Sequence, residues 1–144
     1  MAKTLWYVNG IRTCIRAGMG VAAVSGTPKF MFLNSTYVLD QDNHDFANDV
    51  TSAQVTGTGV VSGGLTIAGL TVTADGPTNA GIIDFNDVTG ISVTGCYGVL
   101  YIDTGTTSTS PLLCVTDFSD GTGVDQVITA AILASNGYAA LTAA

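Results

Sequence analysis

The sequence predicts an all-β protein, a β-sandwich of the jelly-roll type with a short helix or arm at its N-terminus. Three observations predict this fold. From Pro28 onward, short runs rich in Val, Ile, Thr and Tyr recur at regular spacing. Turn-forming pairs that contain glycine, such as Gly63-Gly64 and Asp120-Gly121, separate many of these runs. Helix-length segments do not alternate with the runs, so a parallel sheet built of βαβ units is not expected.

Residues 1–28 are predicted to form a basic arm or short helix that precedes a β-sandwich domain at residues 29–144. Two structures compete for residues 4–19. The sequence Val8-Asn9-Gly10-Ile11 fits the tight turn of a hairpin. Alternatively, Asn9 caps a helix that ends at Gly18 or Gly20 and carries an apolar face of Ile11, Cys14, Ile15 and Met19. The helix is favoured because the arginines fall on its other faces.

The predicted strands of the sandwich follow one another from residue 29. They cover residues 29–33, 37–39, 65–67, 70–73, 80–85, 91–94, 97–103, 112–118 and 124–132. The polar segment 42–50 is predicted to be a loop that can hold one helical turn. The best hairpin candidate joins 97–103 to 112–118 through an uncharged loop that Pro111 closes.

Charged residues are few and unevenly distributed. All four basic residues lie in the first 29 positions, at Lys3, Arg12, Arg16 and Lys29, and all 11 acidic residues are aspartates that follow them. The surface of the main body must therefore consist of Thr, Ser, Asn, Gly and Asp. Such a surface loses little side-chain entropy when another protein covers it. It cannot hold a phosphate backbone, so nucleic acid is not expected as a partner of the main body.

Neither a membrane nor a disulfide framework is expected. The longest apolar blocks, such as residues 130–134, are far too short to span a bilayer. The N-terminus has no apolar core of the signal-peptide type. Cys14, Cys96 and Cys114 are odd in number and widely spaced, which predicts small buried side chains in a protein made in a reducing cytoplasm.

Candidate catalytic groups are few. His44, the single histidine, lies in a segment with several aspartates, but the glycine and glutamate of an EF-hand are absent, so a solvated turn is favoured over a metal site. A pair between a cysteine and His44 depends on proximity that spacing does not reveal. Asp84 and Asp87 could serve as glycosidase carboxylates, although capping of loop amides is the expected role. We therefore expect a non-enzyme with no catalytic residue, no metal ligand and no cofactor.

A series of short motifs runs in order through about two-thirds of the chain, from Lys29 to Phe118. They are Phe30-Met31-Phe32-Leu33 leading to Tyr37, Asp40-x-Asp42-x-His44-Asp45-Phe46, Asp49-Val50-Thr51, Gly57-x-Gly59, Gly63-Gly64, Asp84-x-x-Asp87-Val88-Thr89, Tyr101-x-Asp103-Thr104-Gly105 and Ser110-Pro111-Leu112-Leu113. Their order and spacing resemble a family of small virion proteins of tailed bacteriophages. The sequence departs from that family at Val60, where an aromatic residue is common, and at Gly90, where a tryptophan is frequent. The first 28 residues match it only loosely.

This resemblance implies a structural role in the phage particle and transfers no catalytic residue. The expected function is that of a capsid decoration, or cement, protein, which binds the outer lattice and bridges capsid subunits. Its partners would be the major capsid protein and copies of itself in a homo-oligomer, on the capsid surface of a virion assembled in the host cytoplasm. We expect Lys3, Arg12, Arg16 and Lys29 to bind partners by charge complementarity, and exposed β edges to bind by strand addition.

Two alternatives stay open. A neck, tail or fibre component would contact other virion proteins or the host surface, with the loop at 104–110 as its candidate contact. Copy number per particle separates this role from decoration. A small hydrolase or a carbohydrate-binding module is an alternative of another class, although Trp6 is the single tryptophan available for stacking on a sugar.

Overall fold

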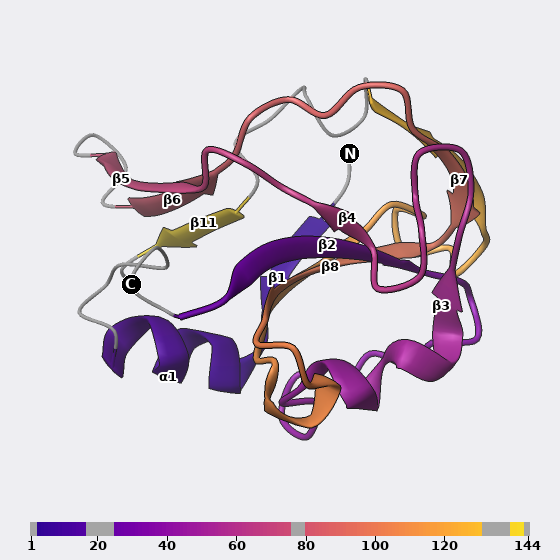
Figure 1. The fold of residues 1–144 in the computed structure, drawn as a ribbon. Coiled ribbons are helices and arrows are strands. Elements are labelled where there is room, and N and C mark those ends of the chain that lie inside the picture. Colours follow the sequence, from indigo (N-terminus) through magenta and orange to yellow (C-terminus); the bar gives the residue numbers. More distant parts are fainter. Residues whose placement is uncertain (1–2, 17–24, 76–79, 131–138, 143–144) are drawn as a thin grey trace.

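The computed structural model describes residues 3–16, 25–75, 80–130 and 139–142, which form an all-β fold with one short helix (Figure 1). In chain order the elements are β1 (Lys3–Trp6), α1 (Val8–Arg16), β2 (Thr27–Leu33), β3 (Gln54–Val55), β4 (Leu65–Thr66), β5 (Thr71–Asp75), β6 (Ala80–Asp84), β7 (Ser92–Gly95), β8 (Tyr97–Asp103), β9 (Leu112–Asp117), β10 (Gln126–Thr129) and β11 (Ala139–Thr142). Short 3₁₀ turns lie at Ala47–Asp49, Thr51–Ala53 and Thr107–Thr109.

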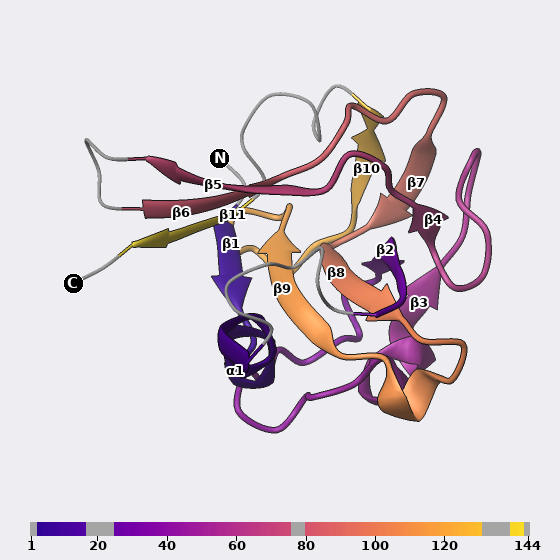
Figure 2. The same cartoon turned by 60° about the vertical axis from the view of Figure 1, so that its left-hand side comes forward.

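A six-stranded antiparallel sheet forms the centre of the fold. Its strand order is β1-β9-β8-β2-β3, and β4 also pairs with β2. The two longest strands, β2 and β8, pair along their whole length, from Thr27 opposite Asp103 to Leu33 opposite Tyr97. Two smaller sheets, β10-β7 and β11-β6-β5, complete the architecture. In Figure 2 the sheet of β5, β6 and β11 extends sideways from the rest of the molecule.

The central sheet is buried on both faces, which gives the protein two cores. On β2, Phe30 and Phe32 enter the first core, whereas Met31 and Leu33 enter the second. The first core is closed by residues of the smaller sheets and their connections, including Val60, Ile67, Ile83, Val93 and Ile128. The second is closed by Tyr7, Tyr37 and the 3₁₀ segment through Ala47, Val50 and Ala53. Burial on both faces explains why β2 and β8 read as continuous apolar runs with no polar alternation.

A β-bulge in the β8–β9 hairpin changes which face of the sheet the side chains of β9 point to, and so which core they enter. Leu100 lies opposite Cys114 and Tyr101 lies opposite Leu112, so Leu113 is the extra residue. Leu113 and Cys114 both belong to the first core, although they are neighbours in sequence. The bulge therefore lets two consecutive apolar residues enter the same core.

Most of the sequence predictions for the fold are confirmed. The chain is all-β with a short helix, and the predicted hairpin of 97–103 with 112–118 is present as β8 and β9. The jelly-roll topology stays a prediction. The strand predicted at 37–39 is wrong: the amide of Tyr37 donates to the carbonyl of Asn34 in a turn, and its side chain enters the second core. The strands β1, β3 and β11 were not predicted.

The N-terminal segment belongs to the central sheet rather than forming a separate arm. Residues 3–6 pair with β9 in register, from Lys3 opposite Asp117 to Trp6 opposite Cys114. This pairing satisfies backbone groups that β9 would otherwise leave open at the edge of the sheet. The helix expected after it is present as α1, whereas the expected stops at Gly18 and Gly20 and the position of Met19 lie outside the described residues.

Candidate partner-binding surface

Helix α1 lies directly against β9, and a glycine makes this approach possible. A Cβ atom at Gly10 would lie 2.3 Å from the carbonyl oxygen of Leu113, a distance that no side chain tolerates. The amide of Tyr7 donates to the same oxygen at 3.0 Å, and the amide of Val8 donates to the carbonyl of Gln41 at 3.1 Å. The start of α1 is therefore held against the sheet on one side and the 40–45 loop on the other.

The predicted helix cap at Asn9 is wrong in detail. The helix begins at Val8, two residues before the start that a cap at Asn9 implies, and the carbonyl of Tyr7 accepts the first helical bond, from Ile11, at 3.1 Å. The side chain of Asn9 instead donates to the carbonyl of Asp45 at 3.3 Å. Asn9 thus ties the helix to the 40–45 loop.

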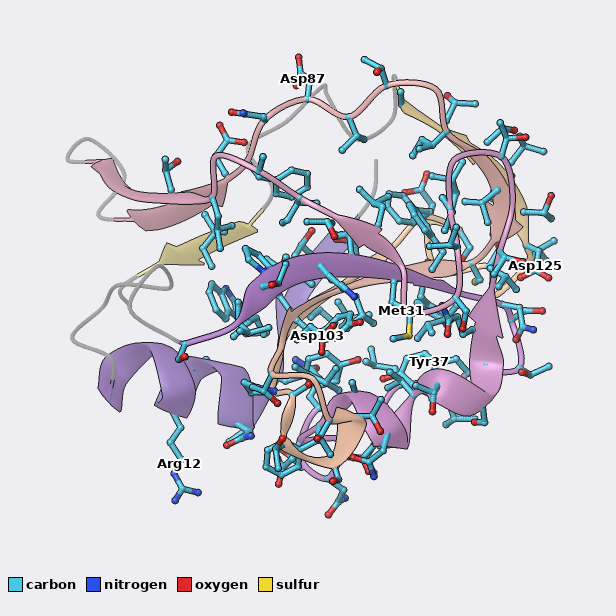
Figure 3. All side chains as sticks on the ribbon, viewed as in Figure 1. Arg12, Met31, Tyr37, Asp87, Asp103 and Asp125 are labelled. Atoms are coloured by element: carbon cyan, nitrogen blue, oxygen red, sulfur yellow. The ribbon has the colours of Figure 1, made fainter. Side chains whose placement is uncertain are left out.

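The outer side of α1 carries an apolar and a basic residue in one line. Val8 is 52% exposed and Arg12 is exposed one helical turn further along. Figure 3 shows the Arg12 side chain pointing away from the body of the molecule. Arg16 continues the same four-residue spacing, which places positions 8, 12 and 16 on one side of a helix. We call these three positions the helix stripe.

Lys29, another predicted partner-binding residue, forms an ion pair with an aspartate of the same chain. Its Nζ lies 2.7 Å from Oδ2 of Asp103, and both side chains are about one-quarter exposed. The amide of Gly105 donates to Oδ1 of the same carboxylate at 2.8 Å. The hydrogen bond from Lys29 and this amide hold the pKa of Asp103 below its usual value. This ion pair joins β2 to the end of β8, so the charge of Lys29 is already balanced before any partner binds.

The four predicted basic residues therefore have different surroundings. Lys3 stands in β1, opposite Asp117 in the register, and Lys29 pairs with Asp103. Arg12 extends into solvent from α1. The side chains of Lys3 and Arg16 are not among those that the structure describes. Of the two basic side chains that the structure describes, Arg12 on α1 is therefore the one that extends into solvent, whereas Lys29 is paired.

An open strand edge forms a second exposed feature. Within the described part of the chain β10 pairs with one strand, β7, from Gln126 opposite Gly95 to Thr129 opposite Ser92. Ile128 is fully buried in the first core, whereas Val127 on the other side of the strand is 61% exposed and Val124 is 57% exposed. Natural edge strands are usually protected by a lysine, a proline or a bulge. The residues of β10, Gln-Val-Ile-Thr, provide none of these.

The position of β10 is fixed from outside its own sheet. The amide of Ser35 donates to Oδ1 of Asp125 at 2.7 Å, which connects the residue before β10 to the turn after β2. Asp125 lies at the right-hand side of the molecule in Figure 3. This bond and the buried Ile128 fix where β10 lies relative to the central sheet.

His44 belongs to a hydrogen-bonded chain with two tyrosines. The hydroxyl groups of Tyr7 and Tyr37 are 2.7 Å apart, and the Tyr37 hydroxyl lies 3.0 Å from Nδ1 of His44. Tyr37 also packs edge-on against Tyr97, with ring centroids 5.3 Å apart. The chain connects the 40–45 loop to the second core, which favours a structural role for His44. Cys114 lies in the first core, on the opposite face of the central sheet from Tyr37.

Burial raises the pKa of Tyr37 and the pKa of Tyr101 to about 12, from an ordinary value of 10. In unfolded chains both phenols ionise near pH 10, so between pH 10 and 12 the unfolded state binds fewer protons than the folded state. We therefore expect the free energy of unfolding to fall as the pH rises through this interval. Urea unfolding at a series of pH values measures the slope. Tyr37→Phe should be less stable at neutral pH but lose less stability above pH 10; an unchanged slope would contradict the assignment.

The aspartates around His44 bind backbone amides. The Asp40 carboxylate accepts from the side chain and amide of Asn43 and from the amide of Asp42, and these bonds lower the pKa of Asp40. Asp49 accepts from the amides of Asp45 and Phe46, each at 2.9 Å. These are the turn-capping roles that the sequence predicts.

The described residues contain few other groups that could act as catalytic or metal-binding side chains. Asp84 accepts from the amide of Phe85 at 2.9 Å, as expected for a loop cap. In the ranges that the structure describes, no three His, Cys, Asp or Glu side chains come together as metal ligands would. No helix in those ranges is long and apolar enough to cross a membrane.

The comparisons with known proteins add no further constraint: no family model, no curated protein and no solved structure matches this chain.

Proposed function

We propose that this chain is a structural protein of a tailed-phage particle, and that it decorates the outer capsid lattice as a cement protein. The observation that carries the proposal is the open, uncharged edge of β10 with Val127 and Val124 exposed beside it. An edge of this kind recruits an extended segment of another protein, whose backbone completes the sheet. The partner proposed is the major capsid protein.

Strand addition at β10 would supply both affinity and orientation. Among the described residues no strand pairs with the side of β10 away from β7, so the amide and carbonyl groups there would bond to the added strand. Burial of the remaining exposed area of each valine contributes about 1 kcal/mol. Ordering the contact costs little, because the surrounding residues are Thr, Ser, Gly and Asp with few long side chains. A copy that contacts two capsid subunits stabilises the assembled lattice by mass action, since it binds the assembled state alone.

Two further observations support this function. The ordered motifs between residues 29 and 118 resemble those of small phage virion proteins. The side chains that could take part in chemistry, the partly buried His44 and the buried Tyr7 and Tyr37, form hydrogen bonds that fasten a loop to the core. A neck or tail role uses the same kind of surface, and its distinguishing feature is a small ring of copies at one vertex.

Substitution of Val127 by lysine tests the β10 edge. We expect Val127→Lys to lower binding to particles that lack this protein by at least about tenfold, because a charge on an edge strand opposes strand addition. Cosedimentation with the particles measures binding, and cryo-electron microscopy of wild-type particles counts copies and locates them. Val61→Lys is the matched control, because Val61 is 68% exposed and lies outside β10.

Equal binding of Val127→Lys, Val61→Lys and the wild type would remove β10 from the contact. Many copies on the capsid exterior would establish decoration, whereas a ring at one vertex would assign the protein to the neck or tail. Absence from the particle would overturn the virion function altogether.

A further inference from the structure

The edge of β10 is exposed in the free protein, before any particle is bound. Figure 2 shows β10 beside β7, its one paired neighbour among the described strands. An uncharged edge without proline or bulge readily pairs with another strand, and Val127 is exposed beside this one. Free copies that meet at this edge can therefore add strands to one another.

The side chains of the β10-β7 sheet divide between two faces. In the register of these strands Ile128 lies opposite Val93, and both are buried in the first core. Val127 lies opposite Thr94, and both are exposed. Directly opposite residues of an antiparallel pair share a face of the sheet. A strand added to β10 must therefore repeat the same alternation of inward and outward residues.

A second β10 strand repeats this alternation when it runs antiparallel to the first. With Val127 opposite the second copy's Val127, each Gln126 lies opposite an Ile128, and the faces of the two copies coincide. A shift by one residue would place the outward Val127 opposite the inward Ile128, which burial of one face forbids. Of the registers that keep the faces aligned, this one brings the two exposed valines together.

Charge favours this edge as the place where two copies meet. Each copy has a formal net charge of −7, so copies repel one another in most orientations. Neither β10 nor β7 contains a charged residue, and no charged residue follows Asp125 in the chain. In the register with Val127 on the axis, Asp125 would lie opposite Thr129 of the second copy. No like charges would therefore face each other across the pairing.

We propose that two free copies pair through their β10 strands about a two-fold axis, and that binding to the particle replaces this pairing. The two small sheets would join into one antiparallel sheet in the order β7-β10-β10-β7. The contact uses the same patch on both copies, so it occupies both edges and ends at a dimer. The inference rests on the proposed use of β10, since a copy must release its partner before a capsid segment can add to the same edge.

The dimer should be weak and should become tighter as salt is added. A pairing of one short strand from each copy lies at the small end of specific interfaces, so we expect a dissociation constant on the order of 100 μM. Added salt screens the repulsion between two negatively charged copies, whereas hydrogen bonds and the valine contact change little. The dimer should therefore be more populated at about 0.5 M salt than at about 0.02 M, where the Debye length is roughly five times longer.

Sedimentation velocity of the isolated protein, at concentrations below and above this dissociation constant, tests the dimer. Val127→Lys should weaken it at least about tenfold, because two ammonium groups would lie opposite each other on the axis. Val61→Lys makes the same change in net charge at an exposed position outside β10, and it should dimerise as the wild type does. Val127 is exposed, so the fold should persist in its variants, which circular dichroism checks.

Val127→Cys tests the register and the exchange. Cα atoms of directly opposite residues lie about 4.5–5.5 Å apart, within reach of a disulfide bond. Oxidised glutathione, which accepts the two electrons and two protons of the paired thiols, should therefore link two copies. Val61→Cys gives the background from the native cysteines and should stay largely unlinked. The linked Val127→Cys dimer should bind particles that lack this protein at least about tenfold less than the same protein after reduction.

Three results would each overturn the dimer: a wild type that stays monomeric, a Val127→Lys protein that dimerises normally, or a Val127→Cys protein that links no better than Val61→Cys. Equal particle binding before and after reduction would overturn the exchange. The dimer and the proposed function can fail separately. A monomeric wild type whose binding to particles still falls with Val127→Lys would reject the dimer alone, whereas a dimer that binds no particle would reject the proposed function and, with it, the exchange.

Discussion

Replacing Phe30 with alanine is expected to destabilise the protein by about 3–5 kcal/mol, a large share of the roughly 5–15 kcal/mol that holds a domain of this size together. Phe30 lies at the centre of the first core with no exposed area. Its ring meets Phe32 edge-on, with centroids 5.0 Å apart, and lies 6.2 Å from Phe85. Removal of the ring therefore leaves a cavity between the central sheet and the smaller sheets.

Urea unfolding with the fluorescence of Trp6, which packs against the same core, measures this loss. Phe30→Leu should cost less, because it keeps much of the apolar volume. Val61→Ala, at an exposed position, should change stability by less than about 0.5 kcal/mol. A loss below about 1 kcal/mol for Phe30→Ala would contradict a packed core between these sheets.

Replacing Gly10 with alanine should be nearly as damaging, with an expected loss of about 3 kcal/mol or more. The added Cβ would lie 2.3 Å from the Leu113 carbonyl oxygen and 2.7 Å from its Cα. Both atoms belong to the backbone of β9, so no side-chain rotation relieves the clash. Alanine favours a helix over glycine by about 1 kcal/mol, which is too little to offset the displacement.

The neighbouring Asn9→Ala is the matched control for this variant. It loses the hydrogen bond to the Asp45 carbonyl, worth about 1 kcal/mol, and introduces no clash. The midpoint of urea unfolding should therefore fall much further for Gly10→Ala than for Asn9→Ala. A Gly10→Ala protein as stable as the wild type would show that α1 does not rest on β9 through this residue.

The structure distinguishes between the basic residues that were predicted to bind partners, because it pairs Lys29 within the chain and leaves Arg12 exposed. The sequence places Lys3, Arg12, Arg16 and Lys29 together in one segment, and proximity in sequence suggested one basic surface. In the folded chain Lys29 forms an ion pair with Asp103, 74 positions away (103 − 29 = 74). Its partner follows from the pairing of β2 with β8, which no local pattern reveals.

The unpredicted elements share a similar cause. β1 is short and polar at its start, and it becomes a strand because β9 offers it an edge to pair with. The hydroxyl groups of Thr4 and Thr116 share a hydrogen bond of 2.8 Å across this pairing. Residues 37–39 have the composition of a strand, yet Asn34 forms a turn and Tyr37 is drawn into the second core by Tyr7 and His44. In both segments tertiary contacts outweigh local propensity.

Features that depend on near neighbours can be predicted from the sequence. Alternation, β-branched residues and glycine turns located most strands and the β8–β9 hairpin, since these signals act over a few residues. The separation of basic from acidic residues along the chain was also visible there. Which strands lie at an edge of a sheet and which charges form ion pairs within the chain follow from the tertiary structure. Those properties arise from contacts between residues far apart in sequence, and their physical cause is the competition for buried surface and backbone partners across the whole fold.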